Sequence, residues 1–291
     1  MSPTGCDDVI VVGGTGAVGS MIVDLMRRDG SSVAILDPAD PDSPLRGDIT
    51  GPDDIVLRAL ASADIIILAV AESVALAALP TLVRVVRPDA LIVDTLSVKS
   101  RMSVAVENSG RTGEFLGVNP MFRPSLGPAG RPIIAVPYVG GPRGADFVES
   151  LRVWGATVSV MDPDRHDRLA AATQALTHAS VLAFGLALGE LDVSAEEVAG
   201  VEAPPHRTLS ALLARIVNGE PEVYWDVQAG NPYAEAARKA LITACVRLDS
   251  ATGDLENFSD VVKSAAEGLG SRSEELDTLC RRVFEEIGSR K

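Results

Sequence analysis

A glycine motif near the amino terminus most constrains how this chain folds. Residues 14–19 read Gly-Thr-Gly-Ala-Val-Gly, the G-x-G-x-x-G pattern. A short β-branched run at residues 9–12 precedes it directly, and an apolar-periodic segment at residues 17–28 follows. A strand, a glycine turn and a helix in this order are typical of a dinucleotide-binding unit, in which the helix amino terminus faces the pyrophosphate.

The motif and its surroundings predict a cofactor. We expect Gly14 to permit the tight turn, Gly16 to let the backbone approach a pyrophosphate, and Gly19 to let the helix pack on the strand. Asp37 ends a second strand, where a carboxylate binds the ribose 2′-OH and repels a 2′-phosphate. No arginine follows Asp37 directly, so the sequence favours NAD over NADP. The predicted cofactor-binding residues are Gly14, Thr15, Gly16, Ala17, Val18, Gly19, Asp37 and Val70.

The rest of the first half alternates between strand and helix patterns. Beyond the run at residues 9–12, strands are expected at residues 32–36, 65–70, 90–93, 133–137 and 157–161. Helices are expected at residues 74–86, 98–107 and 146–154, and residues 117–131, with three prolines and three glycines, are expected to form a loop. Alternation of this kind predicts a parallel sheet.

From Pro163 onward the apolar period is helical. We expect helices at residues 164–191, 205–218, 224–229 and 232–257, and from residue 260 to the end. A chain of 291 residues is long enough for two domains at about 150 residues each. The sequence therefore predicts an α/β Rossmann dinucleotide-binding domain over residues 1–162, followed by an all-α domain over residues 163–291.

Charge and cysteine content exclude several classes of partner. The chain has 26 Lys and Arg against 40 Asp and Glu, a net charge of −14, which disfavours nucleic acid and anionic membranes. Apolar runs such as residues 63–71 fall short of the ~20 residues that a membrane span needs, and we identify no signal peptide. Three separated cysteines, Cys6, Cys245 and Cys280, argue against a disulfide framework and a zinc site. We expect a soluble cytoplasmic protein without a metal.

Longer motifs carry a resemblance to a known family. Residues 10–19, residues 93–99 (Val-Asp-Thr-Leu-Ser-Val-Lys) and residues 117–124 (Gly-Val-Asn-Pro-Met-Phe-Arg-Pro) resemble the prephenate dehydrogenase family. Residues 174–179, with Arg207 and Arg215, extend the match into the helical half. The resemblance implies a helical dimerisation domain, a homodimer and an active site between the two domains. It also implies an NAD(P)-dependent oxidative decarboxylation of a cyclohexadiene dicarboxylate.

One position departs from the family pattern. Family members usually carry at position 119 a histidine that hydrogen-bonds the C4 hydroxyl of prephenate, but this chain has Asn119. An amide takes no proton at neutral pH, so Asn119 cannot act as a general base. The same loop carries Arg123 in place of the usual glycine, and Ser125 where relatives often have an acidic residue linked to substrate choice.

Two interpretations follow from Asn119. In the first, an amino group replaces the C4 hydroxyl, because a nitrogen lone pair can drive hydride departure without a base. The substrate is then 4-amino-4-deoxyprephenate, and the chain resembles the aminodeoxyprephenate dehydrogenases of antibiotic biosynthesis. In the second, the chain uses prephenate or arogenate slowly, or binds its ligand without turnover. We favour the first interpretation.

The resemblance also assigns roles to other residues, beside simpler structural explanations. Ser97 is expected to reach the C4 substituent and the nicotinamide, although it also suits a helix N-cap. The resemblance gives Lys99 no definite role, and a simple surface charge also explains it. His178 is expected either to line the substrate pocket or to fill the helical core. His166 and His206 are expected at the surface or at helix starts, without a role.

The substrate's carboxylates call for a fixed cation. Arg207 and Arg215 are eight residues apart on a predicted helix, slightly over two turns, so both can face one side. By resemblance Arg215 holds a substrate carboxylate through its bidentate guanidinium, and Arg207 supports the pocket or the dimer. The predicted catalytic residues are Ser97, Asn119 and His178, and the predicted substrate-binding residues are Arg215, Arg207, Arg123 and Gln174.

Overall fold

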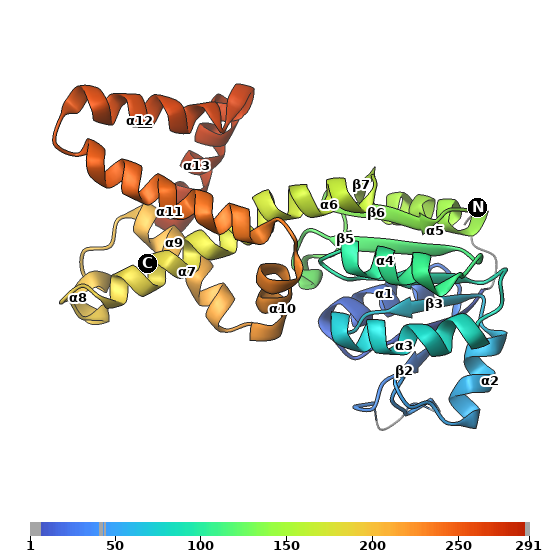
Figure 1. Cartoon of the computed structure of the whole chain (residues 1–291). Coiled ribbons are helices and arrows are strands. Elements are labelled where there is room, and N and C mark those ends of the chain that lie inside the picture. The colour runs from blue at the N-terminus through green and yellow to red at the C-terminus, as the bar shows by residue number, and fades with distance from the viewer. Residues whose placement is uncertain (1–6, 41–42, 44, 289–291) are drawn as a thin grey trace. The chain divides into compact units, whose positions relative to one another are not determined.

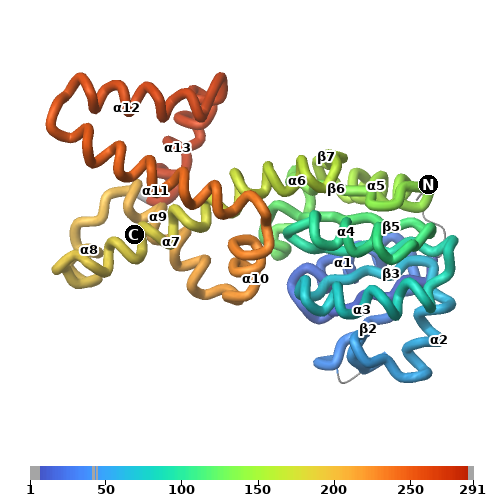
Figure 2. The backbone as a smooth tube through the Cα atoms, viewed as in Figure 1, coloured from blue at the N-terminus to red at the C-terminus, as the bar shows by residue number. Residues whose placement is uncertain are grey.

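A seven-stranded sheet organises the first half of the chain in the computed structural model, which describes residues 7–40, 43 and 45–288 (Figures 1 and 2). The strand order is β2-β1-β3-β4-β5-β6-β7. The strands are β1 (Asp8–Val12), β2 (Ser32–Leu36), β3 (Ile65–Leu68), β4 (Leu91–Asp94), β5 (Phe115–Pro120), β6 (Pro132–Val139) and β7 (Thr157–Val160). Strands β1 to β5 pair in parallel, whereas β6 is antiparallel to β5 and parallel to β7.

The last three strands differ from the sequence expectation. The predicted loop at residues 117–131 is wrong at its start, because residues 117–120 complete strand β5, which is buried over most of its length. Burial in the sheet overrides the local turn signal of Gly117 and Pro120. A side chain at position 117 would not fit there, since its Cβ would lie 2.6 Å from the Tyr138 hydroxyl. The purely parallel sheet is also wrong at β6 and β7.

Helices cover both faces of the sheet. Helices α1 (Ala17–Arg28) and α5 (Pro142–Val153) pack on Val9 and Val11 and their neighbours. Helices α2 (Asp54–Ser62), α3 (Glu72–Val85) and α4 (Ser100–Ser109) pack on the other face, with Ile10 and Val12. Alternate residues of β1 thus enter opposite cores, as the two-residue repeat of a strand requires. Helix α2 is absent from the sequence expectation, although Asp53 caps it.

The second half is helical, as predicted. Its helices are α7 (Leu176–Gly189), α8 (Ala195–Ala199), α9 (Pro204–Val217), α10 (Pro221–Trp225), α11 (Ala234–Ala251), α12 (Leu255–Glu267) and α13 (Ser273–Gly288). Helix α7 approaches α9 so closely that a Cβ on Gly185 would lie 2.6 Å from the Leu213 side chain. The single helix expected over residues 232–257 is wrong, because α11 ends at Ala251 and Asp254 caps α12.

Packing divides the chain slightly later than the sequence suggests. The first unit runs to Ala170 and includes Gly230–Pro232, and the second holds Ala171–Ala229 and the chain from Tyr233. The expected boundary at Asp162 precedes α6 (Pro163–Ala170), which packs against α4 and β6 within the first unit. A π-helical turn, Ala171–Ala175, begins the second unit. Helix α6 therefore brings polar side chains to the sheet domain.

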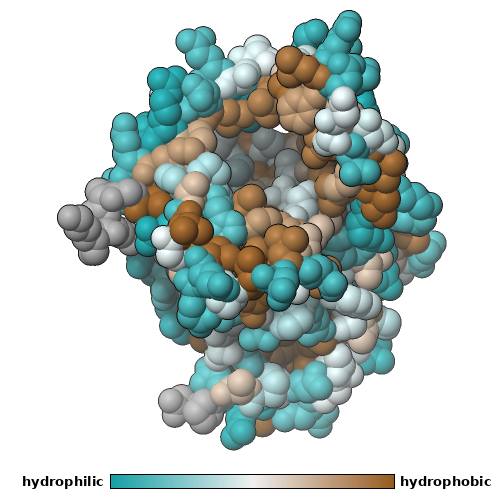
Figure 3. Space-filling view, turned by 90° about the vertical axis from the view of Figure 1, so that its left-hand side faces the viewer, coloured by the Kyte–Doolittle hydropathy of each residue, from teal (hydrophilic) through white to brown (hydrophobic). Residues whose placement is uncertain are grey.

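The helical unit leaves many apolar side chains exposed. Figure 3 shows hydrophobic side chains gathered on the face of the molecule turned to the viewer. Exposed large apolar residues on α7, α9, α11 and α12 include Leu186, Leu209, Leu212, Ile242, Val246, Phe258 and Val262. The run Pro163–Gly189 is 27 residues long and, by length and composition alone, apolar enough to cross a membrane, which the sequence analysis did not anticipate. It also carries the buried polar residues His166 and Asp167.

Candidate active site

The glycine motif forms a tight turn between β1 and α1. Gly13 has the left-handed backbone (φ +76°), so the strained position of the turn is Gly13 and not Gly14 as expected. A Cβ on Gly19 would lie 2.1 Å from the Gly13 carbonyl oxygen, so this glycine allows α1 to approach the turn. A Cβ on Gly14 would lie 2.8 Å from Ile35. Val70 also packs at the turn, 2.9 Å from a Cβ placed on Gly13.

This turn offers what a pyrophosphate requires. Gly16 is the N-cap of α1; no side chain caps that end, and the first turn holds no acidic residue. The free N–H groups of Ala17 and its neighbours and the helix dipole therefore favour an anion there. A Cβ on Gly16 would meet only the Gly13 carbonyl oxygen, at 3.3 Å. The turn fits the phosphates of a dinucleotide.

Asp37 lies beside the turn, at the end of β2. One of its carboxylate oxygens accepts hydrogen bonds from the Thr15 N–H (3.2 Å) and hydroxyl (2.5 Å), and the other accepts from the Ala39 N–H (2.9 Å). Burial raises the pKa of Asp37, but these hydrogen bonds outweigh it and the net pKa is lowered. Asp37 is therefore ionised and fixes Thr15, and the oxygen that accepts from Ala39 keeps a further lone pair for a ribose hydroxyl.

Lys99 is fully buried behind the end of β4. Its Nζ donates to Asp94 Oδ1 at 2.6 Å and to the Val118 carbonyl oxygen at 3.0 Å. Burial lowers the pKa of Lys99, and the Asp94 carboxylate opposes this shift. The surface position considered for Lys99 is wrong: the side chain ties the segment after β4 to strand β5.

Ser97 precedes helix α4 but does not cap it. The helix begins at Ser100, with Lys99 as its N-cap, so the N-cap role considered for Ser97 is wrong. The carboxylate of Asp167 caps the helix instead, accepting from the backbone N–H groups of Lys99 and Ser100, each at 2.9 Å, and from the Ser100 hydroxyl. The half-buried Ser97 hydroxyl has no hydrogen bond with any residue that the structure describes, which leaves it available to a ligand.

Asn119 lies beside a histidine that the sequence analysis left without a role. The Asn119 Nδ2 atom is 3.0 Å from His166 Nε2, and His166 Nδ1 is 2.7 Å from Asp167 Oδ1. Asn119 is 2% exposed and both other residues are fully buried. The expectation that His166 is a surface residue is wrong. The adjacent pair His166-Asp167 on a buried helix face was the available signal, and it was missed.

A second group of candidate residues lies in the helical unit. Gln174 Oε1 and His178 Nδ1 are buried, with no hydrogen-bond partner among the described residues. The His178 ring packs edge-on against Tyr224 at 5.0 Å. Burial lowers the pKa of His178, and the charge of Arg215 lowers it further. Buried polar atoms without partners cost free energy, so this group suits a polar ligand.

Comparison with known proteins assigns the family. Residues 44–131 match the family described as prephenate dehydrogenase, nucleotide-binding domain, and residues 162–264 match prephenate dehydrogenase, dimerization domain. A 4-amino-4-deoxyprephenate dehydrogenase of Streptomyces pristinaespiralis is 46% identical over 282 residues, covering 94% of this chain and 95% of the relative. The chain belongs to the prephenate dehydrogenase family. Its predicted class, a dehydrogenase with a nucleotide cofactor, is confirmed.

More distant members of the prephenate dehydrogenase family match this chain in sequence or in fold. A probable arogenate/prephenate dehydrogenase of Methanocaldococcus jannaschii is 25% identical over 91% of this chain and 61% of its own length. The crystal structure of prephenate dehydrogenase from A. aeolicus in complex with hydroxyphenyl propionate and NAD+ superposes with a TM-score of 0.69. It is 18% identical and covers 96% of this chain and 99% of that one. The predicted Rossmann domain followed by a helical domain is confirmed.

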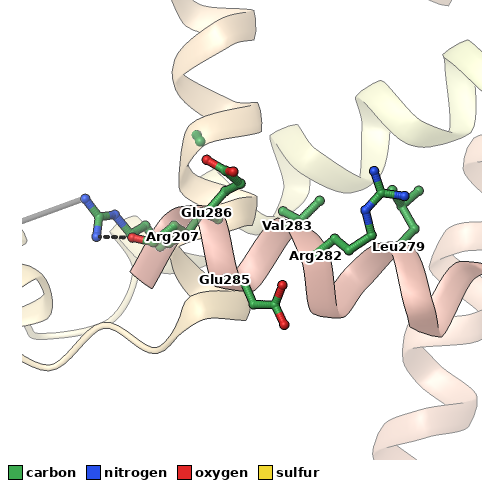
Figure 4. A pocket seen from close by; sticks show the side chains of 8 residues that line it. Arg207, Leu279, Arg282, Val283, Glu285 and Glu286 are labelled. Atoms are coloured by element: carbon green, nitrogen blue, oxygen red, sulfur yellow. Dashed lines mark hydrogen bonds between the residues drawn. The ribbon is translucent and has the colours of Figure 1, made fainter. Parts of the chain in front are cut away.

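Two arginines expected at the substrate have other surroundings in this family member. The Arg207 side chain extends from α9 to the carboxyl end of α13, where a guanidinium nitrogen donates to the Ile287 carbonyl oxygen at 3.4 Å (Figure 4). Arg207 also pairs with Glu202 at 3.4 Å. Arg123 is exposed, directly before a short 3-10 helix, Pro124–Leu126. Arg207 therefore supports helix packing within the chain, and its expected role at the pocket or the dimer stays a prediction.

Proposed function

We propose that this enzyme catalyses the NAD-dependent oxidative decarboxylation of 4-amino-4-deoxyprephenate to 4-aminophenylpyruvate, CO2 and NADH. The observation that carries the proposal is a buried Asn119, held by His166, at the position of the family's histidine. The similarity to the 4-amino-4-deoxyprephenate dehydrogenase of Streptomyces pristinaespiralis supports it. We also propose a role in antibiotic biosynthesis, which the resemblance described in the sequence analysis implies.

The chemistry of the substrate explains why Asn119 suffices. The C4 hydrogen leaves as hydride, the C1–carboxylate bond breaks to release CO2, and its electron pair enters the ring, which becomes aromatic. A neutral C4 amine stabilises the developing positive charge with its nitrogen lone pair, so no base is needed to remove a proton first. Asn119 then has only to accept a hydrogen bond and hold the amine. A protonated histidine would repel a cationic amine.

We propose the following roles for the other candidate residues. The guanidinium of Arg215 binds a substrate carboxylate bidentately, since a dianionic substrate requires a fixed cation. Gln174 and His178 offer their unpartnered buried atoms to the same ligand. The available hydroxyl of Ser97 binds the C4 group. Arg123 remains a candidate for the exposed end of the substrate.

The cofactor proposed is NAD. The turn of residues 13–19 and the amino end of α1 would hold the pyrophosphate, and Asp37 would hold the ribose. Bound NAD supplies the hydride acceptor. A 2′-phosphate would meet the ionised Asp37 carboxylate, whose pKa is lowered by hydrogen bonds despite the opposing effect of burial. This repulsion favours NAD over NADP.

We further propose a cytoplasmic homodimer that associates through the helical unit. The match to a dimerization domain and the exposed apolar residues of α7, α9 and α11 support this. A partner subunit would cover the apolar part of Pro163–Gly189, which accounts for its composition without a membrane. Cys245 and Cys280 are exposed and unpaired, as suits a reducing compartment; Cys6 lies outside the described residues.

NADH formation tests the proposal directly. The purified enzyme is offered 4-amino-4-deoxyprephenate, prephenate and arogenate side by side, with NAD and with NADP. We expect the highest kcat/KM with the amino compound and NAD. A preference for prephenate or arogenate would instead indicate tyrosine synthesis, and no turnover of any of the three would indicate a binding protein.

A single substitution tests the role of Asn119. We predict that Asn119→His raises kcat with prephenate at least about 100-fold, the low end of what a positioned base contributes. The same variant should lose activity with the amino substrate, because an imidazolium repels a cationic amine. Circular dichroism confirms that the variant is folded. Unchanged prephenate turnover in a folded variant would show that Asn119 does not discriminate the two substrates.

A further inference from the structure

The hydrogen bonds around His166 define which nitrogen carries its proton. A carboxylate in its ionised form only accepts hydrogen bonds, so the 2.7 Å contact between Asp167 Oδ1 and His166 Nδ1 requires a proton on Nδ1. In the neutral ring, Nε2 then has a lone pair and accepts. The Asn119 atom facing it at 3.0 Å must therefore be the amide NH2. The tautomer of His166 thus fixes the orientation of Asn119.

The hydrogen bonds of Asp167 keep its carboxylate ionised, which favours the tautomer of His166 with the proton on Nδ1. Its carboxylate accepts from the backbone N–H groups of Lys99 and Ser100, from the Ser100 hydroxyl, and from His166. Burial raises the pKa of Asp167, but the hydrogen bonds outweigh it and keep the carboxylate ionised. Burial lowers the pKa of His166, which keeps the ring neutral near pH 7.

The remaining polar atom of the Asn119 side chain is its carbonyl oxygen. Oδ1 makes no hydrogen bond with a described residue, and it is not among the fully enclosed atoms that lack a partner. An oxygen in this state is an acceptor for a ligand. An amine whose single lone pair drives hydride departure offers Asn119 only N–H donors, whereas a hydroxyl oxygen has a second lone pair and can either donate or accept. The orientation of Asn119 therefore matters more for an amino substrate than for a hydroxyl one.

We propose that His166 is a specificity-determining positioning residue, which holds the Asn119 amide with Oδ1 available to the C4 nitrogen of the substrate. This inference rests on the proposed function, because it explains how that function selects an amine. His166 itself touches neither substrate nor cofactor in this scheme. Asp167 acts one step further away, by fixing the proton on Nδ1.

The arrangement depends on pH in a defined direction. A protonated His166 donates from both ring nitrogens, so Asn119 must turn Oδ1 toward the ring and NH2 toward the substrate. The charged and titratable groups around His166 are Asp167, Lys99 and Asp94, with Tyr138 next to Asp94. Burial, and then Asp94, raise the pKa of Tyr138, so this group does not titrate near neutrality. Amine binding should therefore weaken as the pH falls and His166 takes up a proton.

Two substitutions separate positioning from packing. His166→Leu removes the acceptor, whereas His166→Gln keeps an oxygen near the place of Nε2 and does not titrate. We expect His166→Leu to raise KM for 4-amino-4-deoxyprephenate about tenfold, the effect of one lost hydrogen bond, with a smaller change for prephenate. His166→Gln should keep the wild-type ratio of the KM values for the two substrates. Its KM for the amino compound should not show the rise at low pH that His166 causes in the wild type. The KM of one substrate is compared across variants at the same pH, because the substrate's own titration then affects every variant equally.

The tautomer is measured without any activity. The chain has three histidines, so a long-range 1H–15N spectrum of the labelled wild type resolves each ring, and His166→Gln assigns the signal of His166. We expect a neutral ring with its proton on Nδ1 at pH 7.5. A proton on Nε2 or a charged ring would overturn the inference, even if His166→Leu fails to fold.

The outcomes distinguish the two proposals. A wild type that prefers the amino compound, with the same ratio of KM values in His166→Leu, would overturn the role of His166 alone. A wild type that turns over prephenate but not the amino compound would overturn the proposed function, and the specificity role of His166 with it. Loss of amine preference in His166→Leu and its retention in His166→Gln supports both.

Discussion

Arg215 and Arg207 lie on the same helix, α9, in different surroundings. Arg215 lies near His178 and its unpartnered Nδ1, whereas Arg207 pairs with Glu202 and α13. We predict that Arg215→Ala lowers kcat/KM about 100-fold, mostly through KM, as expected for a lost bidentate contact to a carboxylate. Arg207→Ala serves as the matched variant. It should lower Tm and leave kcat/KM nearly unchanged. Equal losses of kcat/KM would contradict this division.

The buried histidines make stability depend on pH. Burial lowers the pKa of His166 and His178 in the folded protein below the ordinary value of about 6.5. Below about pH 6.5 the unfolded chain takes up protons that the folded chain does not, so the free energy of unfolding falls, by at most about 1.4 kcal/mol per pH unit for each group. We predict that the Tm of His166→Gln falls less between pH 7.5 and 5.5 than the Tm of the wild type does. Thermal unfolding followed by circular dichroism measures this, and parallel losses would refute it.

At the scale of elements, the turn between β1 and α1 is the most constrained. A Cβ at position 19 would lie 2.1 Å from a backbone oxygen, so Gly19→Ala must displace α1 or the turn. We predict at least about tenfold weaker NAD binding and a destabilisation of about 1–3 kcal/mol. Gly51→Ala is the control, because nothing lies within 4 Å of its added Cβ. Calorimetric titration with NAD checks both, and normal affinity in Gly19→Ala would count against the turn as the cofactor site.

The elements that the sequence predicted well are those with a strong local pattern. The strand at residues 32–36 and the helix at residues 17–28 match β2 and α1 at both ends. Strand β5 was missed because Gly117 and Pro120 signal a turn locally, and only pairing with β4 and β6 makes them part of a strand. The break between α11 and α12 was missed because the Asp254 cap was not weighed against a continuing apolar period.

The sequence could predict those candidate site residues that belong to a recognisable motif. The sequence singled out the glycine turn, Asp37 and Asn119 as candidates. His166 and Lys99 were not, because their roles depend on burial: a charged residue in a short polar segment looks exposed until the fold encloses it. Asp167 caps helix α4 at Ser100, which is 67 residues away along the chain, and no local pattern reports this contact.

At the scale of the whole molecule, the exposed apolar residues of the helical unit predict association. Ile242 and Val246 are 63% and 62% exposed and lie one turn apart on α11. We predict that replacing both by Glu raises the dimer dissociation constant at least about 100-fold, because charge at an apolar interface is costly. Val153→Glu, on α5 and 59% exposed, is the control. Light scattering after size exclusion gives the mass, and a monomeric wild type would exclude the proposed homodimer.

The return of Gly230–Pro232 to the first unit bears on how the protein is made. Asn231 is buried there and donates to the Asp167 carbonyl oxygen at 2.8 Å. Ribosomes add roughly 5–20 residues per second, so Asn231 emerges several seconds after Ala170. The sheet domain of a nascent chain therefore lacks the Asn231 hydrogen bond to Asp167 while α7 to α10 are being synthesised. A chain that ended at Ala170 would lack this hydrogen bond permanently.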